Sequence, residues 1–183
     1  MKLWKWMLLP VLLFCLTGCA EKKPTPEQIA AHYVDRPFHA VYTVTTHAGF
    51  YTAYQLDCIA GQEGATVVIL QPESVAGITA RFQGNDAVLQ YQEISLDALL
   101  PEVAGYAPMD MLHCLLQDLQ SPPTFVGTEQ GSLALEYRGI TADGTETLKL
   151  VYLNPQTLDL QRAECYLNDS LILALDMEML AWQ

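Results

Sequence analysis

Asp110, His113 and Cys114 are the only acid, base and thiol that lie close together in this sequence. Such a set could perform nucleophilic catalysis, in which a histidine takes the proton of the thiol. Asp110 and His113 are three residues apart on a predicted helix, so their side chains can meet. Cys114 directly follows His113, and neighbouring residues on a helix point about 100° apart. Because the thiol is aimed away from its base, we expect no enzymatic activity from this cluster.

The other histidines are also poor candidates for chemistry. His39 and His47 share one face of a predicted strand, but eight residues separate them by about 26 Å, too far for a shared metal ion. His32 and His39 could approach one another in space, although no pattern requires it. No cysteine pair has zinc-ligand spacing, and no phosphate-binding loop or nucleophile elbow is present. We therefore predict no catalytic residue, no metal and no cofactor.

Cys19 is the residue with the clearest predicted chemistry. It ends the run Leu16-Thr17-Gly18-Cys19, which follows a short apolar segment and two lysines near the N-terminus. This is the layout of a secretory signal and is too short to span a membrane. The run resembles the bacterial lipobox, in which the cysteine is diacylated and becomes the first residue after cleavage. Two acyl chains anchor a protein stably. We predict a signal peptide over residues 1–18 and attachment to the extracytoplasmic face of the cell membrane; the alternative is a plain signal peptide.

The overall charge limits the partners of the chain. The formal net charge is −12 over 183 residues. The predicted cleavage removes Lys2 and Lys5 and no acidic residue, which leaves 165 residues and a charge of −14. Such a surface repels phosphate backbones, so nucleic acid is excluded as a partner and the acyl chains must supply membrane attachment. This length corresponds to one domain with a substantial core.

Three cysteines remain besides Cys19, and they could form one disulfide with one thiol left over. They are Cys58, Cys114 and Cys165. A domain of this size does not need a disulfide to fold, so we favour buried free thiols.

The pattern of residues then places the elements of the domain. A polar tether spans residues 19–26, and the domain spans 27–183. Thr25, Pro26 and Gln28 form a helix-capping signal. Alternating residues and turn signals predict nine strands, at 38–48, 50–60, 66–70, 78–83, 87–93, 133–141, 147–153, 158–167 and 171–180. Two helical segments, 96–100 and 109–119, lie between the fifth and sixth of these strands.

This order of elements predicts an α+β fold that is mainly antiparallel β. We expect a curved half-open barrel of about nine strands, with the helical insert covering its concave face. Alternation would place five residues of the last strand on one face, opposite the apolar stripe of the helix. The predicted ligand-binding residues are Leu112, Leu116, Leu171, Leu173, Leu175, Met177 and Met179. They either line a hydrophobic cavity or fill a closed core.

Two segments also carry a family resemblance. Residues 71–80 (QPESVAGITA), followed by Leu89-Gln90-Tyr91, resemble the LolA/LolB-like lipoprotein carriers, which include germination-type lipoproteins of spore-forming bacteria. The resemblance implies an unclosed antiparallel barrel with helices over an apolar cavity. It also implies binding of acyl chains, or service as an anchored partner of envelope proteins. Arg36 and Arg81 are the candidates for the arginine that holds the lid of the soluble carrier.

Two functions follow as expectations. The first is an anchored lipoprotein that binds a lipid or acyl chain without catalysis, in a stationary role because it is itself anchored. The second is an anchored interaction module without a small ligand, which docks an envelope protein or forms a homodimer through an edge strand or its acidic surface.

Overall fold

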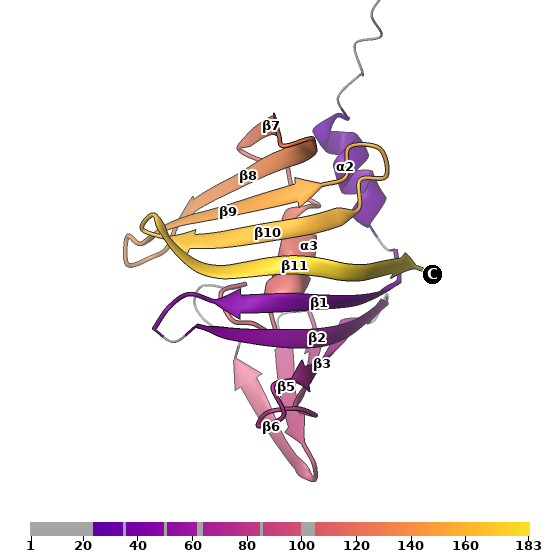
Figure 1. The fold of residues 1–183 in the computed structure, drawn as a ribbon, viewed down its shortest axis with the longest axis vertical. Coiled ribbons are helices and arrows are strands. Elements are labelled where there is room, and N and C mark those ends of the chain that lie inside the picture. The colour runs from indigo at the N-terminus through magenta and orange to yellow at the C-terminus, as the bar shows by residue number, and fades with distance from the viewer. Residues whose placement is uncertain (1–23, 35, 50, 62–63, 85, 100–104) are drawn as a thin grey trace, which may run out of the picture.

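One antiparallel sheet contains all eleven strands that the structure, a computed structural model, describes (Figure 1). The described residues are 24–34, 36–49, 51–61, 64–84, 86–99 and 105–183. The order of strands across the sheet is β6-β5-β4-β3-β2-β1-β11-β10-β9-β8-β7. The first half comprises β1 (Phe38–Thr46), β2 (Thr52–Gly61), β3 (Gly64–Gln71), β4 (Thr79–Gln83), β5 (Asp86–Tyr91) and β6 (Ile94–Leu99). The second comprises β7 (Phe125–Glu129), β8 (Ser132–Ile140), β9 (Glu146–Leu153), β10 (Leu160–Leu167) and β11 (Ser170–Trp182).

The nine predicted strands are all present, but the count of nine is wrong. Residues 96–100 were predicted to be helical, whereas Ile94–Leu99 forms β6 and pairs with β5. Apolar and polar residues alternate here with the period of a strand: Ile94 and Leu96 are apolar, and Ser95 and Asp97 are polar. This alternation outweighs the helix propensity of leucine. The second addition, β7, is a short strand at the edge of the sheet, and β8 is its one partner among the described strands. The tight turn at Gln130-Gly131, with positive φ at both residues, joins the two.

Helix α2 (Pro26–Tyr33) begins where the sequence predicts. Thr25 accepts a hydrogen bond from the backbone of Gln28, whose side chain accepts one from the backbone of Thr25. This reciprocal pair satisfies two of the backbone donors that a helix start leaves open. Neither described helix is long and apolar enough to cross a membrane. The predicted signal peptide and Cys19 lie outside the described residues.

Helix α3 (Met111–Asp118) lies on one face of the sheet because of the topology. β6 and β7 are at opposite edges, so the chain between them must cross a face. α3 contacts β4 through the stacked rings of His113 and Phe82, and β9 through the Asp118–Lys149 ion pair. These two strands are six positions apart in the sheet, about 29 Å if it were flat. His113 and Asp118 are only about 7.5 Å apart along the helix axis, so the sheet must curl around α3.

The core lies between the curled sheet and the helices. Alternate residues of the strands point inward and form one buried cluster with the helix. The helix contributes Met111, Leu112 and Leu115, and Leu119 at its C-terminal cap also belongs to the cluster. The predicted helical stripe is therefore the packed face of the helix. The helix does not cover the whole sheet. At the β5–β6 end, Tyr91, Ile94 and Leu96 remain 42%, 61% and 62% exposed.

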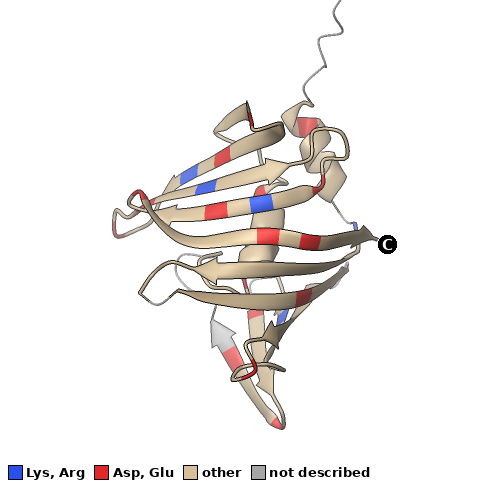
Figure 2. Cartoon of the chain, viewed as in Figure 1, with Lys and Arg blue, Asp and Glu red and all other residues tan. Residues whose placement is uncertain are grey.

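Most charged residues of the described chain lie outside this core, and Asp110, which is 3% exposed, is the exception. Figure 2 shows acidic residues on several different strands and turns. This distribution agrees with a role in solubility.

Candidate functional site

The predicted ligand-binding residues do not line one cavity. Leu112, Leu173 and Leu175 are buried in the closed core, packed between α3 and the sheet. Met177 lies half-buried on the same inner face, opposite Tyr42. Leu116 is half-buried at the edge of the helix. For the buried leucines, the closed-core alternative holds.

Two irregularities in the pairing of β11 change which of its side chains face outward. The pairing with β10 shifts register between Cys165 and Tyr166, and the pairing with β1 shifts between Val41 and Tyr42. A shift of one residue moves a side chain to the other face of a sheet. Leu171 therefore lies opposite Tyr166 on the outer face. Met179 lies opposite Val41 and is 39% exposed, so the expectation of five residues on one face is wrong.

A cleft of about 240 Å³ opens beside α3, at the end of the sheet where α2 packs. Twelve residues line it, and Leu116 is the only one from the predicted set. Its apolar wall includes Tyr33, Phe38, Leu116 and Trp182. Its polar groups are Arg36, His113, Gln117 and Gln120. A mixed lining of this kind suits a ligand with an apolar part and a polar end.

Small residues at the β2–β3 connection keep this space open. Ala60, Gly61, Gly64 and Ala65 all line the cleft. Gly64 has a φ of +138°, and a Cβ atom on it would lie 2.0 Å from the carbonyl oxygen of Phe82. Only glycine fits there without moving the backbone of β4. The close approach of β3 and β4 beside the cleft therefore depends on this residue.

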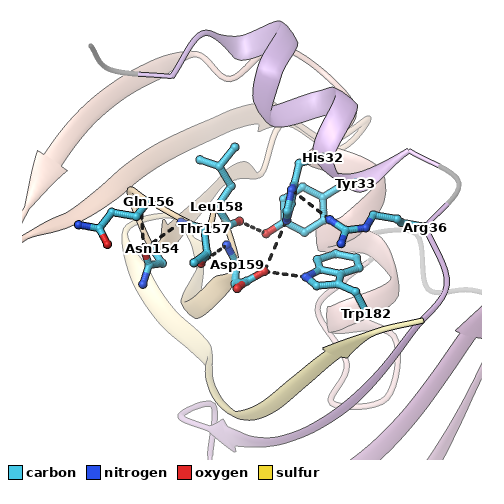
Figure 3. A network of polar contacts seen from close by, with 9 residues as sticks. All are labelled: His32, Tyr33, Arg36, Asn154, Gln156, Thr157, Leu158, Asp159 and Trp182. Atoms are coloured by element: carbon cyan, nitrogen blue, oxygen red, sulfur yellow. Dashed lines mark hydrogen bonds and ion pairs between the residues drawn. The ribbon is translucent and has the colours of Figure 1, made fainter. Parts of the chain in front are cut away.

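One wall of the cleft is fixed by a network around Asp159 (Figure 3). Trp182 Nε1 donates a hydrogen bond of 2.6 Å to Asp159, and His32 Nε2 lies 3.5 Å from the same oxygen. Burial alone would raise the pKa of Asp159, but hydrogen bonds from Trp182, Thr157 and His32 hold the pKa below its ordinary value. Asp159 is therefore a carboxylate at neutral pH and orients the Trp182 ring.

Tyr33 and Arg36 attach the end of α2 to the same network. The Tyr33 hydroxyl donates a hydrogen bond of 2.5 Å to the backbone oxygen of Leu158, in the β9–β10 turn. The Arg36 guanidinium stacks 4.3 Å from the centre of the Trp182 ring and donates to His32 Nδ1 at 3.3 Å. Residues from both ends of the domain thus meet at the cleft. No local pattern in the sequence could have identified Trp182 as a site residue.

His113 contributes the polar side of α3 to the cleft. Its ring stacks on Phe82 with centres 5.0 Å apart, and its Nε2 lies 3.1 Å from the Gln117 amide. Burial lowers the pKa of His113, so its ring is neutral at pH 7. A neutral imidazole can still donate one hydrogen bond.

The acid–base–thiol cluster is not arranged for catalysis. Asp110 accepts hydrogen bonds from the backbone N–H groups of Gly105 and Ala107, at 3.1 and 2.9 Å. It therefore fixes the loop that leads into α3. Burial raises the pKa of Asp110, and it raises the pKa of the Cys114 thiol to about 12. A thiol with such a pKa is not a nucleophile at neutral pH.

The cysteines are buried, and His39 and His47 each contact a neighbouring side chain. Cys58, Cys114 and Cys165 are free and buried, as predicted. His39 Nε2 lies 2.7 Å from Asp57 on the outer face, and His47 packs edge-on against Tyr51.

Comparison with solved structures places the fold among known proteins. No protein-family model matches the sequence, and no curated protein matches it. An uncharacterized conserved protein from Thermus thermophilus aligns with a TM-score of 0.53 at 8% identity, covering 86% of this chain and 85% of that chain. A LolA superfamily protein from Nitrosomonas europaea aligns with a TM-score of 0.45 at 12% identity, covering 87% and 94%.

A third match comes from the structure of the CwlD amidase from Clostridioides difficile in complex with the GerS lipoprotein. It has a TM-score of 0.42 and 14% identity, and covers 89% of this chain and 95% of that chain. LolA-like lipoproteins, which the sequence resembles, are thus among the solved structures that align with this chain. At these identities the likeness concerns the fold.

Proposed function

We propose that this protein is an extracytoplasmic lipoprotein, anchored through diacylated Cys19, that binds a lipid or acyl chain without catalysing a reaction. The cleft beside α3 is the observation that carries this proposal. The cleft is partly open to solvent, and its apolar wall is formed by Phe38, Leu116 and Trp182. These three side chains also pack in or against the core of the curled sheet. Burial of an acyl chain there contributes about 0.8 kcal/mol for each methylene removed from water.

The size of the cleft sets the kind of ligand. About 240 Å³ is below the range of roughly 300–1,000 Å³ typical of small-molecule sites, so the cleft suits one chain and not a two-chain lipid. Deeper entry would require α3 to move away from the sheet. The helix is held by the ion pair of 2.7 Å between Asp118 and Lys149, and by its buried apolar residues.

The test is native mass spectrometry with lipid extraction on residues 20–183, purified from the cell envelope of the source organism. We expect an amphiphile near one-to-one stoichiometry. Leu116→Asp should remove it while the circular dichroism spectrum is unchanged. Leu171→Asp, a leucine on the outer face, should retain it. Leu173→Asp should unfold the protein, because Leu173 is part of the closed core. A bound lipid that Leu116→Asp retains would contradict the proposed site.

A second candidate function is a protein-interaction module, and the free edge of β6 favours it. β6 has no strand partner on its outer edge in the described part of the chain, and Ile94 and Leu96 beside this edge are exposed. Such an edge can pair with a strand of another chain. Antiparallel pairing with a second copy, centred on Leu96, would place Ser95 opposite Asp97, so that no like charges face each other.

A further inference from the structure

The described cationic side chains differ in whether a carboxylate neutralises them. Three of the five form ion pairs: Arg138 with Glu136, Lys149 with Asp118, and Arg162 with Glu164. Arg36 and Arg81 have no carboxylate partner among the described residues. A chain with 21 acidic and 9 basic residues has ample carboxylates to pair them. Of these two arginines, only Arg36 lines the cleft beside α3.

The described lining of the cleft carries no acidic side chain. None of its twelve described lining residues is Asp or Glu, in a chain where such residues are common. Its polar groups are one guanidinium, one imidazole and two amides, all of which can donate hydrogen bonds. Two carboxylates near the cleft that the structure describes already have partners, since Asp159 accepts from Trp182 and Asp118 pairs with Lys149.

Two contacts orient the exposed Arg36 side chain. Its guanidinium lies over the Trp182 ring, and the ring is fixed by its hydrogen bond to Asp159, as Figure 3 shows. Only Nη1 has a described hydrogen-bond partner, the Nδ1 atom of His32. Stacking occupies the face of a guanidinium and leaves its N–H edges able to bind an anion with two parallel hydrogen bonds. A fixed donor loses less conformational freedom on binding.

We infer that the cleft takes a single-chain anionic amphiphile, with its carboxylate or phosphate head on Arg36 and its chain along Leu116 and Phe38. This inference rests on the proposed function, and it adds the chemistry of the head. The net charge of the molecule repels anions in general. Preference for an anionic head must therefore come from a local cation, and Arg36 is the one in the cleft. Gln117, on the facing helix, carries an amide that can donate a further hydrogen bond.

Trp182 allows binding at this cleft to be measured directly. The other two tryptophans, Trp4 and Trp6, lie in the predicted signal peptide, so Trp182 is the sole tryptophan of the processed chain. The experiment uses the processed, lipid-anchored protein in phosphatidylcholine nanodiscs. Quenching of Trp182 fluorescence is followed on addition of 9,10-dibromostearate, and separately of its uncharged methyl ester. Octadecyl phosphate and octadecanol are then added as competitors, which distinguishes a phosphate head from a carboxylate head.

We expect the acid to quench with an affinity at least about tenfold higher than the ester. Arg36→Gln should remove this preference while ester binding is unchanged, and Arg81→Gln, the matched control outside the cleft, should keep it. Preferential displacement by octadecyl phosphate over octadecanol would extend the head to phosphate, and displacement by neither would restrict it to carboxylate. Equal binding of acid and ester would overturn the inference and leave the proposed function standing. Binding of neither would overturn both.

Discussion

Buried polar side chains in this protein differ in whether the fold gives them a partner. Asp110 accepts two backbone hydrogen bonds, which offset part of the cost of its burial. The hydroxyls of Tyr42 and Tyr137 are buried and have no hydrogen-bond partner among the residues that the structure describes. The three thiols are buried as well, and burial raises the pKa of each to about 12. These groups lie in the core as packing residues and not as reactive ones.

Tyr42→Phe should increase stability. Tyr42 is 0% exposed, so its hydroxyl has lost its hydrogen bonds to water and has gained no hydrogen bond from the described residues. Removing it should raise the free energy of unfolding by about 1 kcal/mol, measured from the urea midpoint at constant m-value. Tyr33→Phe is the matched control, because its hydroxyl donates to Leu158, and it should lower stability by about 1 kcal/mol. Equal losses in the two variants would show that Tyr42 does have a partner.

At the scale of elements, hydrogen bonds of a few side chains decide how α2 meets the sheet. Asp159, in the β9–β10 connection, accepts a hydrogen bond from Trp182 of β11 and lies beside His32 of α2. Tyr33 adds a bond to Leu158, which has a φ of +63°. That backbone conformation is unfavourable for leucine and persists here because its neighbours hold it. The position of α2, and with it that of Arg36, depends on this turn.

Asp159→Asn should lower stability at pH 7, by about 1 kcal/mol, through a weaker hydrogen bond from Trp182 and the loss of the charge that faces His32. The folded pKa of Asp159 lies below its ordinary value of about 3.9. The contribution of the carboxylate is therefore present above about pH 3.9 and is lost as the pH falls through the lower, folded pKa. Urea unfolding at several pH values should show the difference between wild type and variant shrinking below about pH 3.9.

The control for this measurement is Glu73→Gln, an exposed carboxylate in the loop after β3, which should change stability by less than about 0.5 kcal/mol. A difference between wild type and Asp159→Asn that stayed constant across the whole pH range would contradict a role for the charge.

At the scale of the whole molecule, the sheet is curled but not closed. α3 fills the middle of the curve, and the β5–β6 end projects beyond it with Tyr91, Ile94 and Leu96 exposed (Figure 1). One short helix is too small to cover eleven strands. An exposed apolar end with a free strand edge is the feature that soluble proteins usually protect with charge or proline. In β6 the only charged residue is Asp97, and there is no proline.

Leu96→Lys should therefore weaken self-association. If β6 pairs with a second copy, a lysine at the centre of the pairing brings two positive charges together and removes apolar contact. We expect sedimentation velocity of the processed chain to show a dimer whose dissociation constant rises at least about tenfold in this variant. Ile140→Lys, an exposed apolar residue at the end of β8, is the control and should leave the dimer unchanged. A wild-type chain that stays monomeric would contradict pairing of β6 with a second copy.

Local patterns in the sequence were sufficient for much of the fold. The capping box at Thr25 and Gln28, the nine strands with their turns, and the apolar stripe of α3 depend on residues close together in the chain. These elements could be predicted because helix and strand periods and turn chemistry act over a few residues. The lipobox-like run ending at Cys19 is local in the same way, and its lipidation stays a prediction.

Contacts between distant segments decided the rest. The two register shifts of β11 arise from pairing with β10 and β1, so alternation in the strand alone could not show that Leu171 and Met179 turn outward. The cleft joins Arg36, His113 and Trp182 from three separated parts of the chain. Sequence determined which residues are apolar, charged or able to turn. Only the curling of the sheet around α3 determined which of them meet, because that depends on packing across six strand positions.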